Sequence, residues 1–93
     1  MGRVILRGYI VVPRADLARV AGELPEHVRL TRAEPGCVSF SVEPSEQDPQ
    51  RFDVAEEFID RAAFEAHQDR VRSSVWGQVT LNVARHYEVT EAD

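Results

Sequence analysis

Residues 4–12 carry apolar side chains on both alternating faces, and this double-sided pattern limits the fold more than any other feature of the chain. One face holds Val4, Leu6, Ile10 and Val12, and the other holds Ile5, Tyr9 and Val11. A strand that is apolar on both faces is normally buried on both. Arg7 interrupts the second face, and Pro13 ends the strand. We therefore expect a central strand that is covered from two sides.

A helix is predicted over residues 16–32, where apolar side chains recur with helical spacing. The stripe consists of Leu17, Val20, Ala21, Leu24 and Val28. Pro25 lies within this segment. Because proline lacks an N–H group and collides with the preceding turn, we expect either a kinked helix or two helical segments that meet at Pro25. Gly36 can take a positive φ, which favours a helix end at residues 34–36.

Two strands and a second helix follow this first helix. Residues 37–43 alternate apolar side chains with small or polar ones, and residues 51–59 form the next predicted strand. The polar loop between them, at residues 44–50, favours antiparallel pairing. Asp60 is a good N-cap for a helix over residues 61–72. The buried side of that helix would carry Ala63, Phe64, His67 and Val71. We expect a short helical turn within residues 73–79 and a last strand at residues 81–89.

The predicted order is β-α-β-β-α-β, a ferredoxin-like α+β fold with an antiparallel sheet. Ninety-three residues suffice for one core, so residues 1–93 are expected to form a single domain. Helices cover only one face of such a sheet, which leaves the second apolar face of residues 4–12 open. The simplest cover is the same sheet of a second copy, in a symmetric homodimer. The alternative is a monomer with an unusually apolar first strand.

The composition argues against several classes of function. The net charge is −5 and the basic residues are scattered arginines, so neither a nucleic-acid partner nor an anionic membrane is expected. The longest apolar run, residues 9–12, is far shorter than a membrane span. A single cysteine and the lack of a secretory leader pattern predict a cytoplasmic protein. Zinc-ligand spacing and glycine-rich nucleotide motifs are missing, so we expect no metal and no cofactor.

His67 and Glu56 are the candidate catalytic residues. His67 shares the inward side of its helix with Phe64 and Val71, and burial keeps an imidazole neutral and basic near neutral pH. It can serve as a general base, or it can be a core histidine that bonds a backbone carbonyl. Glu56 lies on an otherwise apolar strand face, so its carboxylate needs a partner. It could orient His67 or pair with an arginine. Glu57 would then point to the opposite face.

Six further residues are candidates for substrate binding. Arg7, on the same strand face as Tyr9, could hold an anionic or phenolate substrate, or it could pair with Glu57. The aromatic side chains could wall a pocket, with Trp76 as one wall or as a plug against the sheet. The full set is Arg7, Tyr9, Phe40, Phe58, Phe64 and Trp76. His27 is expected near a pocket mouth, His86 at the surface or an interface, and Cys37 as an inert apolar residue.

With these residues placed, the chain resembles the antibiotic biosynthesis monooxygenase family of dimeric α-β barrels. The resemblance rests on the Glu34-Pro35-Gly36-Cys37 segment with Phe40 after it, on Glu56-Glu57-Phe58, and on His67 nine positions after Phe58. Two positions depart from the family pattern. Phe58 stands where the family has tryptophan, and Arg72 stands where a second histidine is common. The first strand also lacks the asparagine of haem-degrading members, so haem degradation is not expected.

The resemblance implies a cofactor-independent monooxygenase that uses O₂ on a small phenolic or quinol-like aromatic. His67 would remove a phenolic proton, and the substrate anion would pass an electron directly to O₂. Neither a metal nor a flavin would be required, and the protein would act as a homodimer. Two alternatives stay open because one fold supports many functions. The first is a non-catalytic, ligand-binding or stress-related dimer, and the second is an isomerase of a small carbonyl sugar derivative.

Overall fold

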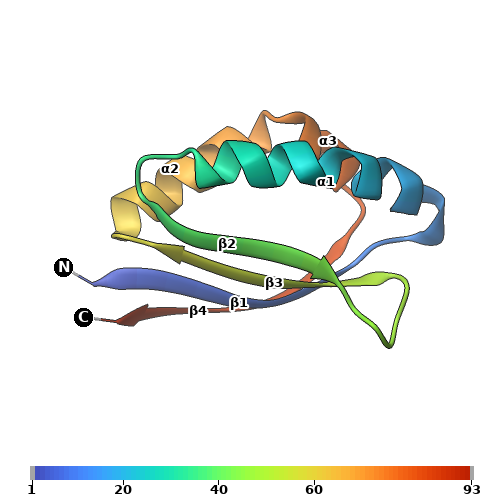
Figure 1. Ribbon diagram of the computed structural model, residues 1–93, viewed down its shortest axis with the longest axis horizontal. Helices are drawn as coiled ribbons and strands as arrows, with labels where there is room; N and C mark the ends of the chain where they lie inside the picture. Colours follow the sequence, from blue (N-terminus) through green and yellow to red (C-terminus); the bar gives the residue numbers. More distant parts are fainter. Residues whose placement is uncertain (1, 93) are drawn as a thin grey trace.

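Four strands form one antiparallel sheet, and the helices all lie on one of its faces (Figure 1). The computed structural model describes residues 2–92. The strands stand in the order β2-β3-β1-β4, which confirms the predicted ferredoxin-like α+β fold. The elements are β1 (Arg3–Val11), a 3-10 turn (Arg14–Asp16), α1 (Leu17–Arg32), β2 (Cys37–Pro44), β3 (Arg51–Phe58), α2 (Arg61–Arg72), α3 (Val75–Val79) and β4 (Ala84–Ala92).

Strand β1 is central, with β3 on one side and β4 on the other. Its side chains Val4, Leu6 and Ile10 face the helices and are almost completely buried. Gly8 interrupts this row because β1 and β4 approach closely there. It has a φ of 158°, and a Cβ atom built on it would lie 1.9 Å from the carbonyl oxygen of His86. A glycine is therefore needed for β4 to pair with β1.

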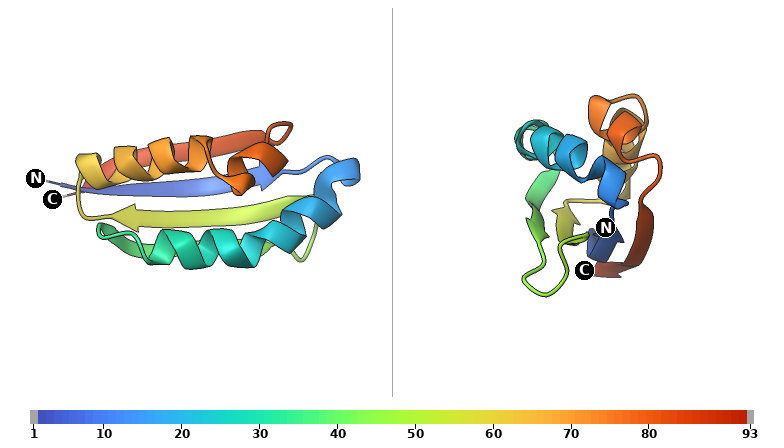
Figure 2. Two further views of the ribbon diagram at one scale, coloured as in Figure 1. Left: turned by 90° about the horizontal axis from the view of Figure 1, so that it is seen from above. Right: turned by 90° about the vertical axis from the view of Figure 1, so that its right-hand side faces the viewer.

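The opposite face of the sheet carries no helix, as the end-on view in Figure 2 shows. In the single chain, Ile5, Tyr9 and Val11 are half-buried on this face, and its cover by a second copy stays a prediction. Charged side chains lie among these apolar ones. Glu57 accepts a hydrogen bond from Arg3 at 2.5 Å. Within one chain Glu57 therefore pairs with Arg3 and not with Arg7.

Helix α1 runs without interruption from Leu17 to Arg32, so the alternative of two segments that meet at Pro25 is wrong. Pro25 deprives the carbonyl of Ala21 of its helical partner, and both residues lie at the exposed surface, where water replaces that bond. Ala21 consequently does not belong to the buried stripe. The inward side of α1 instead carries two polar residues that the prediction omitted, His27 and Thr31, beside Val20.

The turn after α1 needs Gly36 for a reason other than the one predicted. Gly36 has no positive φ, because Gly8 alone does within residues 2–92. A Cβ atom at Gly36 would lie 2.2 Å from the Cβ atom of Ala63, so its small size permits α2 to pack against the start of β2. Asp60 caps α2 as predicted, since its side chain accepts a hydrogen bond of 2.8 Å from the N–H of Ala63.

Helix α3 ends in a turn that delays the last strand. Thr80 closes this helix and its carbonyl accepts a hydrogen bond from the N–H of Val83, so β4 begins at Ala84 and not at residue 81. Leu81, expected on the apolar face of the strand, is 71 % exposed in this turn. None of the helices within residues 2–92 has the length and apolar character to cross a bilayer.

Candidate active site

His67 lies on the inward side of α2, one turn after Phe64, and only 4 % of it is exposed. Its ring packs between two aromatic side chains of the sheet, with centroid distances of 5.0 Å to Phe58 and 5.8 Å to Phe40. Its Nδ1 atom lies 3.0 and 3.2 Å from the two carboxylate oxygens of Glu34. The imidazole is therefore held in one orientation, in apolar surroundings, by a carboxylate from the end of α1.

Glu34 is itself held in place by Arg70, one turn beyond His67. The Nε atom of Arg70 donates a 2.5 Å hydrogen bond to Glu34, and its Nη2 atom donates to the hydroxyl of Thr31 at 3.0 Å. Glu34 accepts the hydrogen bond from Arg70, so it also acts as an acceptor toward His67. His67 therefore donates its Nδ1–H to Glu34, and its Nε2 atom keeps a free lone pair. Burial lowers the pKa of His67, and the negative charge of Glu34 partly opposes this shift.

Glu56 faces the other nitrogen of the same imidazole. One of its oxygens lies 3.8 Å from His67 Nε2, too far for a hydrogen bond, and this buried oxygen has no hydrogen-bond partner in the described structure. Burial, and then the charge of Glu34, raise the pKa of Glu56 to about 7. The sequence suggested that Glu56 orients His67 or pairs with an arginine, and within this chain it does neither. Instead, the Glu56 carboxylate and His67 Nε2 are two neighbouring groups that can each accept a proton.

His27 forms a second buried imidazole beside the first. Its ring stacks on Trp76 with a centroid distance of 4.4 Å and an interplanar angle of 5°, and it lies 6.1 Å from the ring of His67. Burial, with the nearby charges of His67 and Arg70, lowers the pKa of His27 to about 3. His27 is thus neutral at physiological pH. It lies deep in the wall of the site, whereas the sequence predicted a place near its mouth.

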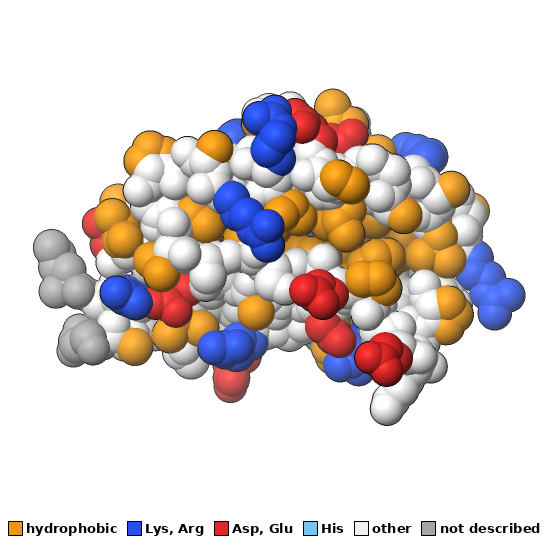
Figure 3. Space-filling model, in the orientation of Figure 1, with side chains coloured by type: hydrophobic (Ala, Val, Ile, Leu, Met, Phe, Trp, Pro, Cys, Tyr) orange, Lys and Arg blue, Asp and Glu red, His pale blue; other side chains and the backbone are white. Residues whose placement is uncertain are grey.

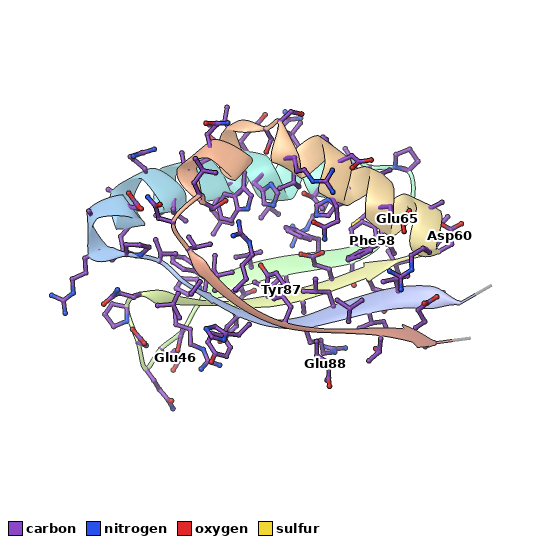
Figure 4. The ribbon with its side chains drawn as sticks, turned by 180° about the vertical axis from the view of Figure 1, so that it is seen from behind. Glu46, Phe58, Asp60, Glu65, Tyr87 and Glu88 are labelled. Atoms are coloured by element: carbon purple, nitrogen blue, oxygen red, sulfur yellow. The ribbon has the colours of Figure 1, made fainter. Side chains whose placement is uncertain are left out.

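These groups border a cavity of about 230 Å³ between the helices and the sheet. It is lined by His27, Glu56, His67, Gln68, Val71, Trp76, Arg85 and Tyr87. Figure 4 shows Tyr87 on the helix side of β4, while its neighbour Glu88 points to the other side. Partial burial and the charge of Glu56 raise the pKa of Tyr87 to about 12, so its hydroxyl stays protonated.

A larger hollow of about 390 Å³ lies at the β2–β3 hairpin, where Glu46 is labelled in Figure 4. Its charged lining residues are Glu43, Glu46 and Asp53, all of them exposed. Among the described residues, no histidine and no buried carboxyl group lines this hollow, so it lacks the buried proton-transfer groups of the smaller cavity. We therefore place the candidate site at His67.

The structure brings some of the predicted site residues together and separates others. Trp76 lines the cavity, and Phe40 and Phe58 flank His67. Phe64 packs behind Phe58, with a centroid distance of 5.8 Å. Figure 3 shows further apolar side chains gathered along the line between α1 and the sheet.

Arg7 and Tyr9 lie on the opposite face of the sheet from His67. There Tyr9 stacks on His86 with a centroid distance of 4.7 Å, and the guanidinium of Arg51 lies 3.9 Å from the centre of its ring. This face is separated from the cavity by the sheet itself. Arg7 and Tyr9 therefore do not join the predicted site within one chain.

Sequence reasoning left four residues of the site unassigned and misplaced a fifth, His27. Glu34 was noted only as part of the helix-ending segment. It lies in the turn after α1, three residues after the buried Thr31, and its side chain reaches α2. The helical spacing of Val20, Leu24, His27 and Thr31 could have revealed that His27 points inward. Gln68, Arg85 and Tyr87 carry no comparable signal, because periodicity does not tell which polar side chains of a helix or strand reach a cavity.

Comparison with known proteins agrees with this architecture. The antibiotic biosynthesis monooxygenase family matches residues 3–76, and the chain belongs to that family. A search among curated proteins gives no significant match. Solved structures show the same fold at low sequence identity. Protein SO0527 from Shewanella oneidensis has a TM-score of 0.78 at 21% identity, covering 97% of this chain and 90% of that one.

Two further structures extend the comparison to the family itself. A presumed antibiotic biosynthesis monooxygenase from Nitrosomonas europaea has a TM-score of 0.76 at 20% identity, with 100% of this chain and 97% of that one covered. A similarly described protein from Deinococcus radiodurans has a TM-score of 0.75 at 23% identity, with 97% and 92% covered.

Within residues 2–92, no three His, Cys, Asp or Glu side chains are grouped as a metal ion would require.

Proposed function

We propose that this protein is a cofactor-independent monooxygenase that acts on a small phenolic or quinol-like aromatic. The observation that carries the proposal is the buried His67, whose Nδ1 is fixed by Glu34 and whose Nε2 lies 3.8 Å from Glu56; His67 and Glu56 both line a cavity of about 230 Å³. A base held in this way can accept a phenolic proton without reorganising. Trp76, His27 and the neighbouring aromatic rings offer flat walls against which a substrate ring can stack.

The chemistry balances with a quinol as its own reductant. Nε2 of His67 takes a proton from one ring hydroxyl, and the resulting anion transfers one electron to O₂. The two radicals then combine to form a C–O bond. Loss of water from the hydroperoxide gives a hydroxyquinone, so one oxygen atom ends in the product and the other in water. The protein supplies the proton acceptor and an enclosed site. His67 returns its proton to the peroxide, and Glu56 in its protonated form can donate to the departing oxygen.

The test measures O₂ consumption with a panel of quinols, together with mass spectrometry of the products under ¹⁸O₂. We expect oxygen incorporation by the wild-type protein. His67→Ala should lower the rate between about a hundredfold and ten-thousandfold, the usual contribution of a general base. Glu65→Ala is the matched control, because Glu65 is exposed on the same helix (Figure 4). Equal turnover by wild type and His67→Ala would refute the assigned role.

A second candidate function is isomerisation of a small carbonyl compound. The observation that favours it is the pairing of Glu56 with His67 at 3.8 Å, since enolisation needs one group to remove a proton and another to deliver one. This reaction does not consume oxygen. Activity that persists under strictly anaerobic conditions would select it over monooxygenation, and ligand binding without any turnover would point to a binding protein.

We further propose that two copies associate through the helix-free face of the sheet. Support comes from Ile5, Tyr9 and Val11, which are half-buried there in a single chain, and from the homodimers that the family resemblance implies. A paired sheet would cover the second apolar side of β1 and stabilise a domain of this size.

A further inference from the structure

Arg85 is the only arginine among the residues that line the cavity. It lies on β4 opposite Ile10, two residues before Tyr87, so both side chains belong to the helix side of the sheet. The family match covers residues 3–76, so it assigns no role to Arg85.

The guanidinium of Arg85 is anchored but not neutralised. Its Nη2 atom donates to the carbonyl and the hydroxyl of Thr80, at 3.3 and 3.2 Å, and Thr80 is 1 % exposed. Both acceptors are uncharged. The ion pairs within residues 2–92 involve Arg3, Arg19, Arg29, Arg51, Arg61, Arg70 and Arg72, but not Arg85. Arg85 thus keeps a positive charge and further N–H donors for a guest in the cavity.

The base and the cation stand at two ends of one site. Glu56 pairs with Leu6 on one side of β1 and Arg85 pairs with Ile10 on the other, so their backbones are offset by roughly 13 Å along the strands and by about 10 Å across two strand spacings. Both side chains reach the same cavity, which makes the gap between their polar ends shorter than that. Tyr87 lies opposite Gly8, between the two rows, and its hydroxyl is beside Arg85. A guest that spans the cavity meets His67 at one end and a cation at the other.

We propose that Arg85 determines substrate specificity, and that the substrate is a phenol or quinol whose ring also bears a carboxylate. The guanidinium would bind the carboxylate while the ring hydroxyl meets Nε2 of His67. Guanidinium and carboxylate match in shape as well as in charge. Arg85 also offsets Glu56, which borders the same cavity and repels an anionic guest whenever it is ionised.

The proposal rests on the proposed function for the role of the ring hydroxyl, but its test needs no turnover. The probes are 4-hydroxybenzoate and its neutral isostere 4-hydroxybenzamide. Trp76, the only tryptophan of the chain, lines the cavity, so its fluorescence reports binding there. Wild type should bind the acid about tenfold to a hundredfold more tightly than the amide, as expected for hydrogen bonds to a charged group.

Two variants of Arg85 and one control make the test specific. Arg85→Gln removes the charge and should abolish the preference for the acid, whereas Arg85→Lys should retain part of it. Arg72→Gln is the control, because Arg72 is exposed on α2 and should keep the wild-type preference. Thermal unfolding of each variant verifies that it folds.

Equal binding of acid and amide by wild type, no measurable binding of either, or an undiminished preference in Arg85→Gln would overturn the proposal. The outcomes also separate it from the proposed function. Oxygenation of neutral quinols without any preference for acids would refute the role of Arg85 and leave the monooxygenase intact. An Arg85-dependent preference for acids in a protein that never consumes O₂ would support the role of Arg85 and refute the monooxygenase.

Discussion

At the scale of single residues, two carboxyl groups meet one imidazole and play different parts because their surroundings differ. Glu34 is bound by Arg70 and serves as a fixed acceptor for His67 Nδ1. Glu56 makes no ion pair with an arginine within residues 2–92, and burial followed by the charge of Glu34 raises its pKa to about 7. One group sets the tautomer of His67, and the other can exchange a proton near neutral pH.

Replacing Glu34 should disturb the tautomer without removing the base. In Glu34→Gln the amide can donate to Nδ1, so the proton of His67 moves to Nε2 and the lone pair no longer faces the cavity. We expect turnover to fall about a hundredfold or more. The ¹⁵N shifts of His67 should report protonation at Nε2 instead of Nδ1. An unchanged tautomer together with an unchanged rate would contradict this assignment.

Glu56 should also make stability depend on pH. Its pKa is about 7 in the folded state and 4.5 in its unperturbed state, so between these values the folded protein binds the extra proton. The protein therefore loses stability as the pH rises from 4.5 to 7, by roughly 3 kcal/mol for this shift. Urea unfolding of wild type and Glu56→Gln at pH 5 and pH 8 checks this. Relative to wild type, Glu56→Gln should be more stable at pH 8 than at pH 5. An equal difference in the free energy of unfolding at both pH values would contradict this prediction.

At the scale of elements, the patterns of burial in the sequence were enough to predict most of the fold. Alternation placed β1, β2 and β3 within about a residue of their observed ends, and the Asp60 cap fixed the start of α2, because these elements bury one repeating face. Pro25 and Leu81 misled the prediction for opposite reasons. Pro25 is tolerated because the carbonyl it frees is solvated, and Leu81 is apolar but lies in an exposed turn.

The close pairing of β1 with β4 gives an element-scale prediction with an internal control. Gly8→Ala should destabilise the protein by about 1–3 kcal/mol or more, because the new Cβ meets the carbonyl of His86 and the φ is unfavourable. Gly22→Ala, in the exposed part of α1 with nothing within 4 Å of a new Cβ, should stabilise it by about 0.5–1 kcal/mol. Chemical denaturation measures both, and a Gly8→Ala variant as stable as wild type would show that β4 is not held this closely.

At the scale of the whole molecule, the site could be predicted only in part. His67 was found because a helix has one inward side, but its partner Glu34 comes from a distant turn that no local pattern relates to it. Arg7 and Tyr9 share a face with Ile5 and Val11. Periodicity separates the two faces of a strand that is apolar on both, but it does not tell which one the helices cover. In the folded chain the helices cover the face that carries Leu6 and Ile10, so Arg85 and Tyr87 of β4 line the cavity.

The helix-free face should hold two copies together, and this is testable on the assembled molecule. Tyr9→Glu places a charge at the centre of that face, next to His86, and should shift the protein from dimer to monomer in sedimentation velocity. Val75→Glu is the control, because Val75 is an equally apolar, 59 % exposed residue on the helix side. A wild-type protein that sediments as a monomer at all concentrations would refute the proposed association.

An oxygen-free crystal structure of the protein with 4-hydroxybenzoate tests the role of His67 most directly. We predict that the ring lies in the cavity beside Trp76, with its hydroxyl oxygen within hydrogen-bond distance of Nε2 of His67 and its carboxylate on Arg85. A ring bound on the helix-free face, or bound in the cavity with His67 Nε2 out of reach, would contradict the assignment of His67 as the base.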